Sequence, residues 1–188
     1  IRGRREQAVI ATKCGIWWAD ARGSFNGKKE GRDTYICLHA DTVRSEVEAS
    51  LKRLKVDAID LLQVHKPAIE PQLTPIEETI GCLMELKRQG KVRAIGVSNV
   101  SMDQLRTYRT CGELDALQFH YNMLNRGPER SFLPYCHDHN IASLTYTSLE
   151  QGLLTGKVTL DRQFDYDDFR CDVGQWMPWF KPENLTRL

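Results

Sequence analysis

The sequence predicts an α/β fold built on a parallel β-sheet, and the order of its segments is the basis of this prediction. Short apolar runs alternate with longer stretches whose apolar residues recur every three or four positions, as on one face of a helix. Strands joined by helices form parallel sheets that the helices cover. The chain has 188 residues, enough to bury a core without disulfides or metals, so we expect one domain over 1–188.

The five apolar runs are predicted to be strands. Each is short and nearly continuous, which is typical of strands that are buried on both faces of a parallel sheet. They cover residues 8–13, 58–65, 92–99, 114–121 and 141–149.

Four amphipathic segments between these runs are predicted to be helices. The first covers 41–56 and the last covers 128–139. The apolar spacing of the first indicates an inward face made of Val43, Val47, Leu51 and Leu54.

The two middle helices are recognised by their ends. Thr74 begins a capping-box pattern with Pro75 at the first helical position, and the helix that follows is expected to end at Gly90. Ser101 is predicted to cap the third helix, which stops at Gly112.

Two regions break this alternation. The glycine-rich stretch 23–31 is expected to be a flexible loop, and residues 158–188 are predicted to be an irregular, lid-like segment. Within that segment Trp176, Trp179 and Phe180 are candidates to close over a site, with ordinary packing as the alternative.

Two parallel architectures fit this pattern, a doubly wound sheet and a (β/α)₈ barrel. A doubly wound nucleotide-binding sheet has a glycine-rich turn after its first strand. Here Lys13, Cys14 and Gly15 follow that strand without the G-x-G-x-x-G spacing, and no P-loop motif occurs in the chain.

Hydrogen-bonding or titratable residues stand at or near the end of every predicted strand. They are Lys13, His65, Ser98, Asn99, Gln118, Tyr121, Tyr146, Thr147 and Ser148. In a parallel barrel the carboxyl ends of all strands open on one face, so these side chains would meet at one mouth. The plainer alternative is that each strand simply ends in polar residues at the surface.

Several of these segments resemble the aldo-keto reductase family. The matching stretches are V-I-A-T-K (9–13), D-L-L-Q-V-H (60–65), K-V-R-A-I-G-V-S-N (91–99), L-Q-F-H-Y-N-M-L-N-R (117–126) and Y-T-S-L-E-Q-G-L-L-T-G-K (146–157). The chain resembles in particular the bacterial members that reduce methylglyoxal and similar small aldehydes.

The resemblance implies a (β/α)₈ barrel and an oxidoreductase that reduces an aldehyde or ketone to an alcohol with NADPH or NADH, NADPH being favoured. The substrate would be a small carbonyl compound. Lys13 resembles the active-site lysine, whose charge lowers the pKa of a tyrosine that donates a proton. His65 resembles the histidine that binds and polarises the substrate carbonyl.

The resemblance also implies how the cofactor binds. Ser98, Asn99 and Gln118 match residues that contact the nicotinamide carboxamide, and Tyr146 matches the aromatic residue that stacks on the nicotinamide ring. The stretch expected beneath the pyrophosphate contains Thr147, Ser148, Leu149, Gln151 and Gly152.

The chain departs from the family at both ends. Family members begin with two strands that supply the proton-donating tyrosine and an aspartate that pairs with the lysine, and neither strand is found before Lys13. The eighth strand is also not found, so we expect a fragment that covers strands three to seven of an incomplete barrel. Two alternatives to an enzyme stay open: a dinucleotide-binding regulatory subunit similar to potassium-channel β subunits, and an inactive reductase remnant.

Composition excludes other classes of function. There are 26 Lys and Arg residues against 25 Asp and Glu, a net charge of +1, so neither nucleic acid nor an anionic membrane is an expected partner. The six cysteines lie at least 23 positions apart, which predicts free thiols in a reducing cytoplasm and no metal site. No apolar run is long enough for a membrane span.

The positions of three further residues are predicted from the strands on which or after which they lie. Trp17 and Trp18 follow the lysine strand directly and are expected to form walls of a substrate pocket, with ordinary packing as the alternative. His120 alternates with Phe119 along its strand and is predicted to face the helix layer.

Overall fold

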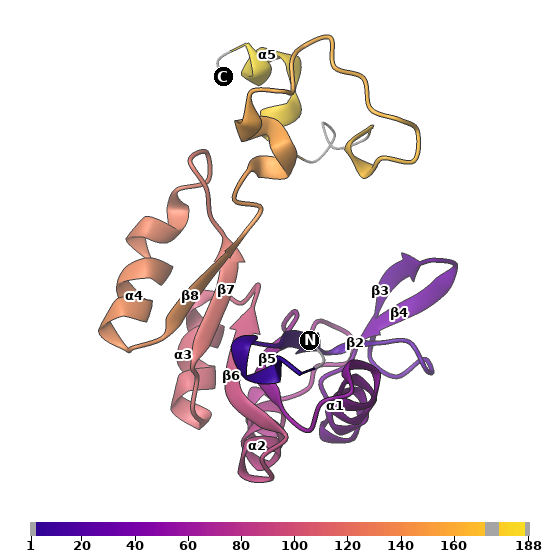
Figure 1. Cartoon of the computed structure of the whole chain (residues 1–188), viewed down its shortest axis with the longest axis vertical. Helices are drawn as coiled ribbons and strands as arrows, with labels where there is room; N and C mark the ends of the chain where they lie inside the picture. The colour runs from indigo at the N-terminus through magenta and orange to yellow at the C-terminus, as the bar shows by residue number, and fades with distance from the viewer. Residues whose placement is uncertain (1–2, 172–176, 187–188) are drawn as a thin grey trace. The chain divides into compact units, whose positions relative to one another are not determined.

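The computed structural model describes residues 3–171 and 177–186 (Figure 1). The chain forms two compact units, one of residues 1–119 with 128–144 and the other of residues 120–127 with 145–188. The first holds most of the regular secondary structure, and the second holds short helical turns around a small core of its own.

The main sheet has five strands and is parallel in every pairing that the register defines. Its strands are β1 (Ala11–Cys14), β5 (Ile59–Val64), β6 (Val92–Ser98), β7 (Ala116–His120) and β8 (Ala142–Tyr146). Each lies within one of the five predicted runs or extends it by one residue, which confirms the predicted parallel α/β sheet.

The order of the strands distinguishes between the two architectures left open by the sequence. The order is β1-β5-β6-β7-β8, so each strand lies beside the one that follows it in the main sheet. A doubly wound sheet reverses its order near the middle, whereas a barrel sheet keeps the order of the chain. The sheet is therefore of the barrel type, and within the described residues it is not closed into a barrel.

Four helices belong to the first unit. They are α1 (Ala40–Leu54), α2 (Ile76–Arg88), α3 (Met102–Cys111) and α4 (Phe132–Asp138), the last preceded by the 3₁₀ turn η2 (Gly127–Arg130). α2 packs on β6 and between α1 and α3, and α1 also contacts β1. Fully buried side chains from the helices and strands, including Val47, Ile80, Leu83, Leu105 and Ile95, form the core.

Two details of the predicted helices are wrong. Leu54, expected on the inward face of α1, is 42% exposed, and Thr42 and Ser50 are buried in that helix together with Val43 and Val47. These buried residues form one stripe along α1, which packs on α2 and β1, and Leu54 is not part of that buried stripe.

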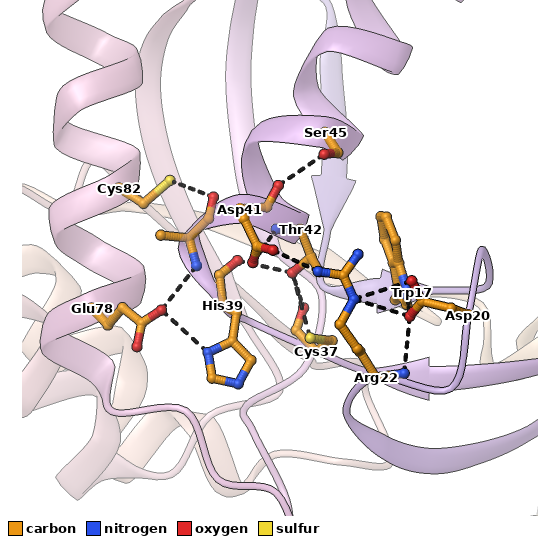
Figure 2. Close-up of polar contacts among 11 residues, drawn as sticks. Trp17, Asp20, Arg22, Cys37, His39, Asp41, Thr42, Ser45, Glu78 and Cys82 are labelled. Atoms are coloured by element: carbon orange, nitrogen blue, oxygen red, sulfur yellow. Dashed lines mark hydrogen bonds and ion pairs between the residues drawn. The ribbon is translucent and has the colours of Figure 1, made fainter.

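The start of α2 also differs from the prediction. Pro75, and not Thr74, is the N-cap residue, and it makes no side-chain cap. Glu78 in the first turn of α2 instead accepts hydrogen bonds from the Ala40 amide at 3.0 Å and from His39 Nδ1 at 3.2 Å. A carboxylate of one helix thus caps the amino end of its neighbour, as Figure 2 shows.

A second sheet replaces the flexible loop expected at 23–31, and this prediction is wrong. The sheet has the order β2-β4-β3, with β2 (Ile16–Trp17), β3 (Ser24–Lys29) and β4 (Arg32–Ile36) antiparallel. Glu30 and Gly31 at its tip have φ of 51° and 76°, the left-handed pair that a tight two-residue hairpin requires. The rings of Phe25 and Tyr35 pack edge to face across the strands at 5.8 Å.

The second unit contains η3 (Glu150–Thr155), η4 (Phe169–Cys171), η6 (Pro178–Phe180) and α5 (Pro182–Leu185). Leu153, Met177 and Phe180 are buried together, and Trp179 packs against them. Trp176 lies outside the described residues. That the segment 158–188 acts as a lid stays a prediction.

Cys14, Cys37, Cys82, Cys111 and Cys136 are free thiols, as their spacing predicted. Among the described residues, the helices are too short or too polar to cross a membrane.

Our first prediction concerns the start of α3, where Ser101 is the N-cap residue as the sequence indicated. Its Oγ accepts a hydrogen bond from the Gln104 amide, and Gln104 Oε1 accepts one from the Ser101 amide. Ser101→Ala should lower the free energy of unfolding by about 1 kcal/mol in urea denaturation. Thr110→Ala, at an exposed position of the same helix, is the control and should change it by less than about 0.5 kcal/mol. Equal losses would contradict the capping role.

Candidate functional site

A pocket of about 600 Å³ opens beside the carboxyl end of β1 in the first unit. It is bounded by β1, the β2-β3-β4 sheet and one face of α1. Its lining includes Lys13, Trp17, Trp18, Glu46 and His65. The two tryptophans therefore line a pocket, as expected.

Parallel register brings Lys13 and His65 to this pocket. Lys13 pairs with Gln63 across β1 and β5, and the His65 amide donates a hydrogen bond to Cys14 O at 2.9 Å. Residues paired across parallel strands, and residues two apart in one strand, point to the same face. The lysine and the histidine are 52 positions apart in the chain, yet both line one cavity.

The imidazole of His65 is held in its neutral form at neutral pH. Its burial lowers the pKa of His65 below the ordinary value, and the positive charges of Lys13, Lys66 and Lys29 lower it further. A neutral imidazole carries one N–H, which can be donated to a carbonyl oxygen.

Three of the predicted cofactor residues lie together at the next two strand ends. Ser98 is buried at the end of β6 and pairs with Gln118 of β7. Asn99 has a left-handed backbone with φ of 59°, and its Nδ2 donates to His65 O at 2.9 Å and to Ser98 Oγ at 3.1 Å. The Asn99 amide donates to Gln118 O at 3.3 Å. One hydrogen-bonded row thus runs from His65 to Gln118.

The remaining predicted residues belong to the second unit. Tyr146 ends β8, and its ring stacks on that of His120 with centroids 5.5 Å apart. Of the other residues, Thr147, Ser148 and Leu149 form the turn that leads into η3. Gln151 and Gly152 belong to the first part of η3. The backbone N–H of Gly152 donates to Leu149 O at 3.0 Å, so its hydrogen bond is made within the turn. Their roles stay predictions.

Glu46 is a pocket residue that sequence reasoning missed. Its Oε2 accepts a hydrogen bond from the Gly15 amide at 2.6 Å, next to the strand that carries Lys13. Burial raises the pKa of Glu46 to about 7, although the Gly15 amide and the charge of Arg53 act in the opposite direction. A glutamate in an amphipathic helix ordinarily faces water, so the sequence carries no signal for this contact.

Charged side chains surround Trp17, as Figure 2 shows. The indole Nε1 of Trp17 donates to Asp20 Oδ1 at 2.7 Å, and the Arg22 guanidinium lies 5.0 Å from the centroid of its ring. Asp20 accepts hydrogen bonds from Arg22 and Trp17, which lower its pKa to about 2. The contribution of Arg22 is the larger of the two. Arg22 also donates to Asp41 Oδ2 at 2.5 Å, which links this wall to the first turn of α1.

Two other observations bear on what the site can bind. Gln63, on the same face of the sheet as Lys13, has a buried Oε1 without a hydrogen-bond partner in the described part of the chain. Within residues 3–171 and 177–186, no group of three or more His, Cys, Asp or Glu side chains could hold a metal ion.

The fold and the site together define a class of protein. It is an α/β protein of the barrel type, with a lysine, a histidine and a row of amide and hydroxyl groups along the carboxyl edge of its sheet. Comparison with known proteins then identifies the family. Residues 1–186 match the Aldo/keto reductase family, and the chain belongs to it.

Individual relatives extend this comparison. The chain is 47% identical over 184 residues to the NADH-specific methylglyoxal reductase of Escherichia coli (strain K12), covering 98% of this chain and 54% of that protein. It is 44% identical over 170 residues to aldo-keto reductase YhdN of Bacillus subtilis (strain 168), covering 89% and 46%. The glycerol dehydrogenase AKR11B4 from Gluconobacter oxydans has a similar structure, with a TM-score of 0.84, 35% identity and coverage of 100% and 53%. The chain therefore spans about half the length of these proteins.

Our second prediction concerns Glu46 and pH. Between pH 4.5 and about 7 the folded chain keeps the proton of Glu46 that the unfolded chain has released, so this group makes the fold less stable as pH rises through that window. Glu46→Gln keeps an oxygen acceptor for the Gly15 amide and removes the titration. The free energy of unfolding of Glu46→Gln, relative to that of the native chain, should rise by up to about 3 kcal/mol between pH 4.5 and 8.

Urea denaturation of both chains at several pH values measures this difference. Glu48→Gln, on the exposed side of the same helix, is the matched control for the loss of a carboxylate from α1. A difference between the native chain and Glu46→Gln that stays constant with pH would show that Glu46 titrates as an ordinary surface carboxyl.

Proposed function

We propose that this chain carries the lysine, the histidine and the cofactor-binding edge of an NAD(P)H-dependent reductase that converts an aldehyde or ketone to an alcohol. The observation that supports this most strongly is that Lys13 and His65 line one pocket, beside the row formed by Ser98, Asn99 and Gln118. The names of the relatives, reductases and a dehydrogenase, favour an enzyme over a regulatory subunit.

The residues at the edge of the sheet fit a nicotinamide group. A carboxamide needs both donors and acceptors, and the Asn99 and Gln118 amides with the Ser98 hydroxyl supply both. When bound, the dinucleotide supplies a hydride. The relative at 47% identity is named NADH-specific, whereas the resemblance noted above favours NADPH, so both cofactors belong in the experiment.

Two side chains of this chain would act on the substrate. The neutral imidazole of His65 would donate an N–H hydrogen bond to the carbonyl oxygen and stabilise the negative charge that develops there. The proton that completes the alcohol would come from the tyrosine that the family resemblance implies, on a strand not found before Lys13. The ammonium group of Lys13 would supply positive charge on the same side of the pocket. Walls formed by Trp17 and Trp18 in a pocket of about 600 Å³ suit a small carbonyl compound such as methylglyoxal.

Our third prediction tests this function with the 188-residue chain. The chain should bind NADH or NADPH, measured by the change in cofactor fluorescence on titration. Any oxidation of the cofactor by methylglyoxal, followed by absorbance, should fall by at least about 100-fold in Lys13→Met, because the charge next to the reacting carbonyl is lost.

The matched control is Lys52→Met, which removes an exposed lysine from α1. It should leave both cofactor affinity and rate unchanged. A native chain that binds neither dinucleotide would contradict the proposed function, and a Lys13→Met variant with the native rate would remove Lys13 from the reaction.

A further inference from the structure

A buried carboxylate stands in the middle of the turn expected to lie beneath the cofactor pyrophosphate. Glu150 is 1% exposed, although the residues on either side of it reach the surface. Its Oε2 contacts His120 Nε2 at 2.9 Å and also accepts a hydrogen bond from Asn122 Nδ2. We call His120, Asn122 and Glu150 the Glu150 cluster. All three residues belong to the second unit.

The hydrogen atoms in the cluster can be assigned. Asn122 Oδ1 accepts hydrogen bonds from the Leu124 and Asn125 amides at 2.8 and 2.9 Å, which fixes the orientation of the side-chain amide. The two hydrogens of Nδ2 then go to Thr147 O, at 2.9 Å, and to Glu150. No hydrogen of Asn122 is left for His120, so in the 2.9 Å contact the imidazole N–H at Nε2 donates and the carboxylate of Glu150 accepts.

These contacts hold a turn whose backbone is strained. Thr147, Glu150 and Gln151 have φ of 56°, 44° and 54°, a left-handed conformation that residues with a Cβ adopt only where their surroundings impose it. Asn122 binds the carbonyl at the start of this stretch, and the side chain of Glu150 anchors its middle. The cluster therefore holds the turn at two points.

The cluster also supports Tyr146. The ring of His120 lies 5.5 Å from that of Tyr146, with an angle of 20° between their planes. The hydrogen bond to Glu150 fixes one nitrogen of the imidazole, and the stacked tyrosine is held beside it. One carboxylate thus connects the turn with the aromatic ring that precedes it.

We propose that His120, Asn122 and Glu150 are positioning residues for the dinucleotide, which hold Tyr146 and the turn 147–152 in the conformation that receives the nicotinamide ring and the pyrophosphate. This proposal rests on the function proposed above. None of the three needs to touch the cofactor, because they act through Tyr146 and through the backbone of the turn.

The test uses the full chain and three variants. His120→Phe keeps a flat ring beside Tyr146 but cannot donate to Glu150, Glu150→Leu removes the acceptor, and the third variant combines both. Each single change should weaken binding of NADH or NADPH at least about tenfold, because His120→Phe removes one hydrogen bond to the buried Glu150 side chain and Glu150→Leu removes two. The double variant should bind no more weakly than the weaker single variant, because the two residues act as one unit.

A second measurement needs no cofactor. The amides of Glu150 and Gly152 donate to Thr147 O and Leu149 O inside the turn, so they should be protected from hydrogen exchange in the native chain. Protection should be lost at these amides in both single variants while the amides of β5 and β6 stay protected. Glu150→Gln keeps an oxygen acceptor and replaces Glu150→Leu in the test if that variant does not fold. It should retain more affinity and more protection than Glu150→Leu.

The matched control is His139→Phe. His139 also stacks on a tyrosine, Tyr135, at 4.1 Å, and its Nδ1 contacts Tyr135 O, but both residues lie in the first unit. This variant should keep native cofactor affinity.

The possible outcomes are distinct. If the native chain binds dinucleotide and the cluster variants bind it equally well, the positioning role is overturned and the proposed function stands. Additive losses in the double variant, or lost protection throughout the chain, would also overturn it in favour of a merely structural role. If the native chain binds neither dinucleotide, the proposed function fails and this inference fails with it.

Discussion

The register between parallel strands is the constraint on which the candidate site depends. Lys13 is paired with Gln63 on β5, Gln63 with Gly96 on β6, and Gly96 with Ala116 on β7. A slip of one residue in any of these pairings would turn the side chains of that strand to the opposite face of the sheet. The Lys13 ammonium and the His65 imidazole share a pocket only because the buried apolar residues between them permit a single alignment.

Gly96 illustrates how closely this alignment is packed. A Cβ at that position would lie 2.8 Å from Gln63 Cγ and 3.2 Å from Ala116 O, so the neighbouring strands approach a backbone without a side chain. The side chain of Gln63 occupies the space beside this glycine, and its Oε1 is buried. Gly96 and Gln63 therefore determine together how closely β5, β6 and β7 pack.

Glutamate side chains organise both units, each in a different way: Glu46 is partly buried and Glu150 is fully buried. In the first unit Glu46 accepts the Gly15 amide and fixes the bend that follows the lysine strand. In the second unit Glu150 holds a turn in which three residues other than glycine are left-handed, a conformation that such residues do not favour. In each case a carboxyl group is withdrawn from water, and backbone or side-chain donors compensate for the lost hydration.

The sequence by itself determined the repeating order of strands and helices, because hydrophobic periodicity depends only on which neighbours along the chain are buried. It also determined which polar residues stand at the strand ends, and through its motifs it indicated the family. It did not reveal the β3-β4 hairpin, whose charged residues 28–33 resemble a loop, and whose turn depends on the left-handed backbone of Glu30 as well as Gly31.

Tertiary structure alone decided the partners of Glu46, His120 and Glu150. The pattern of the sequence assigned His120 to the helix layer, but its ring meets Tyr146 and its Nε2 meets a carboxylate 30 positions away. The reason is physical: periodicity tells which side chains leave water, whereas a hydrogen-bond partner is fixed only when distant segments are packed within about 3 Å of each other.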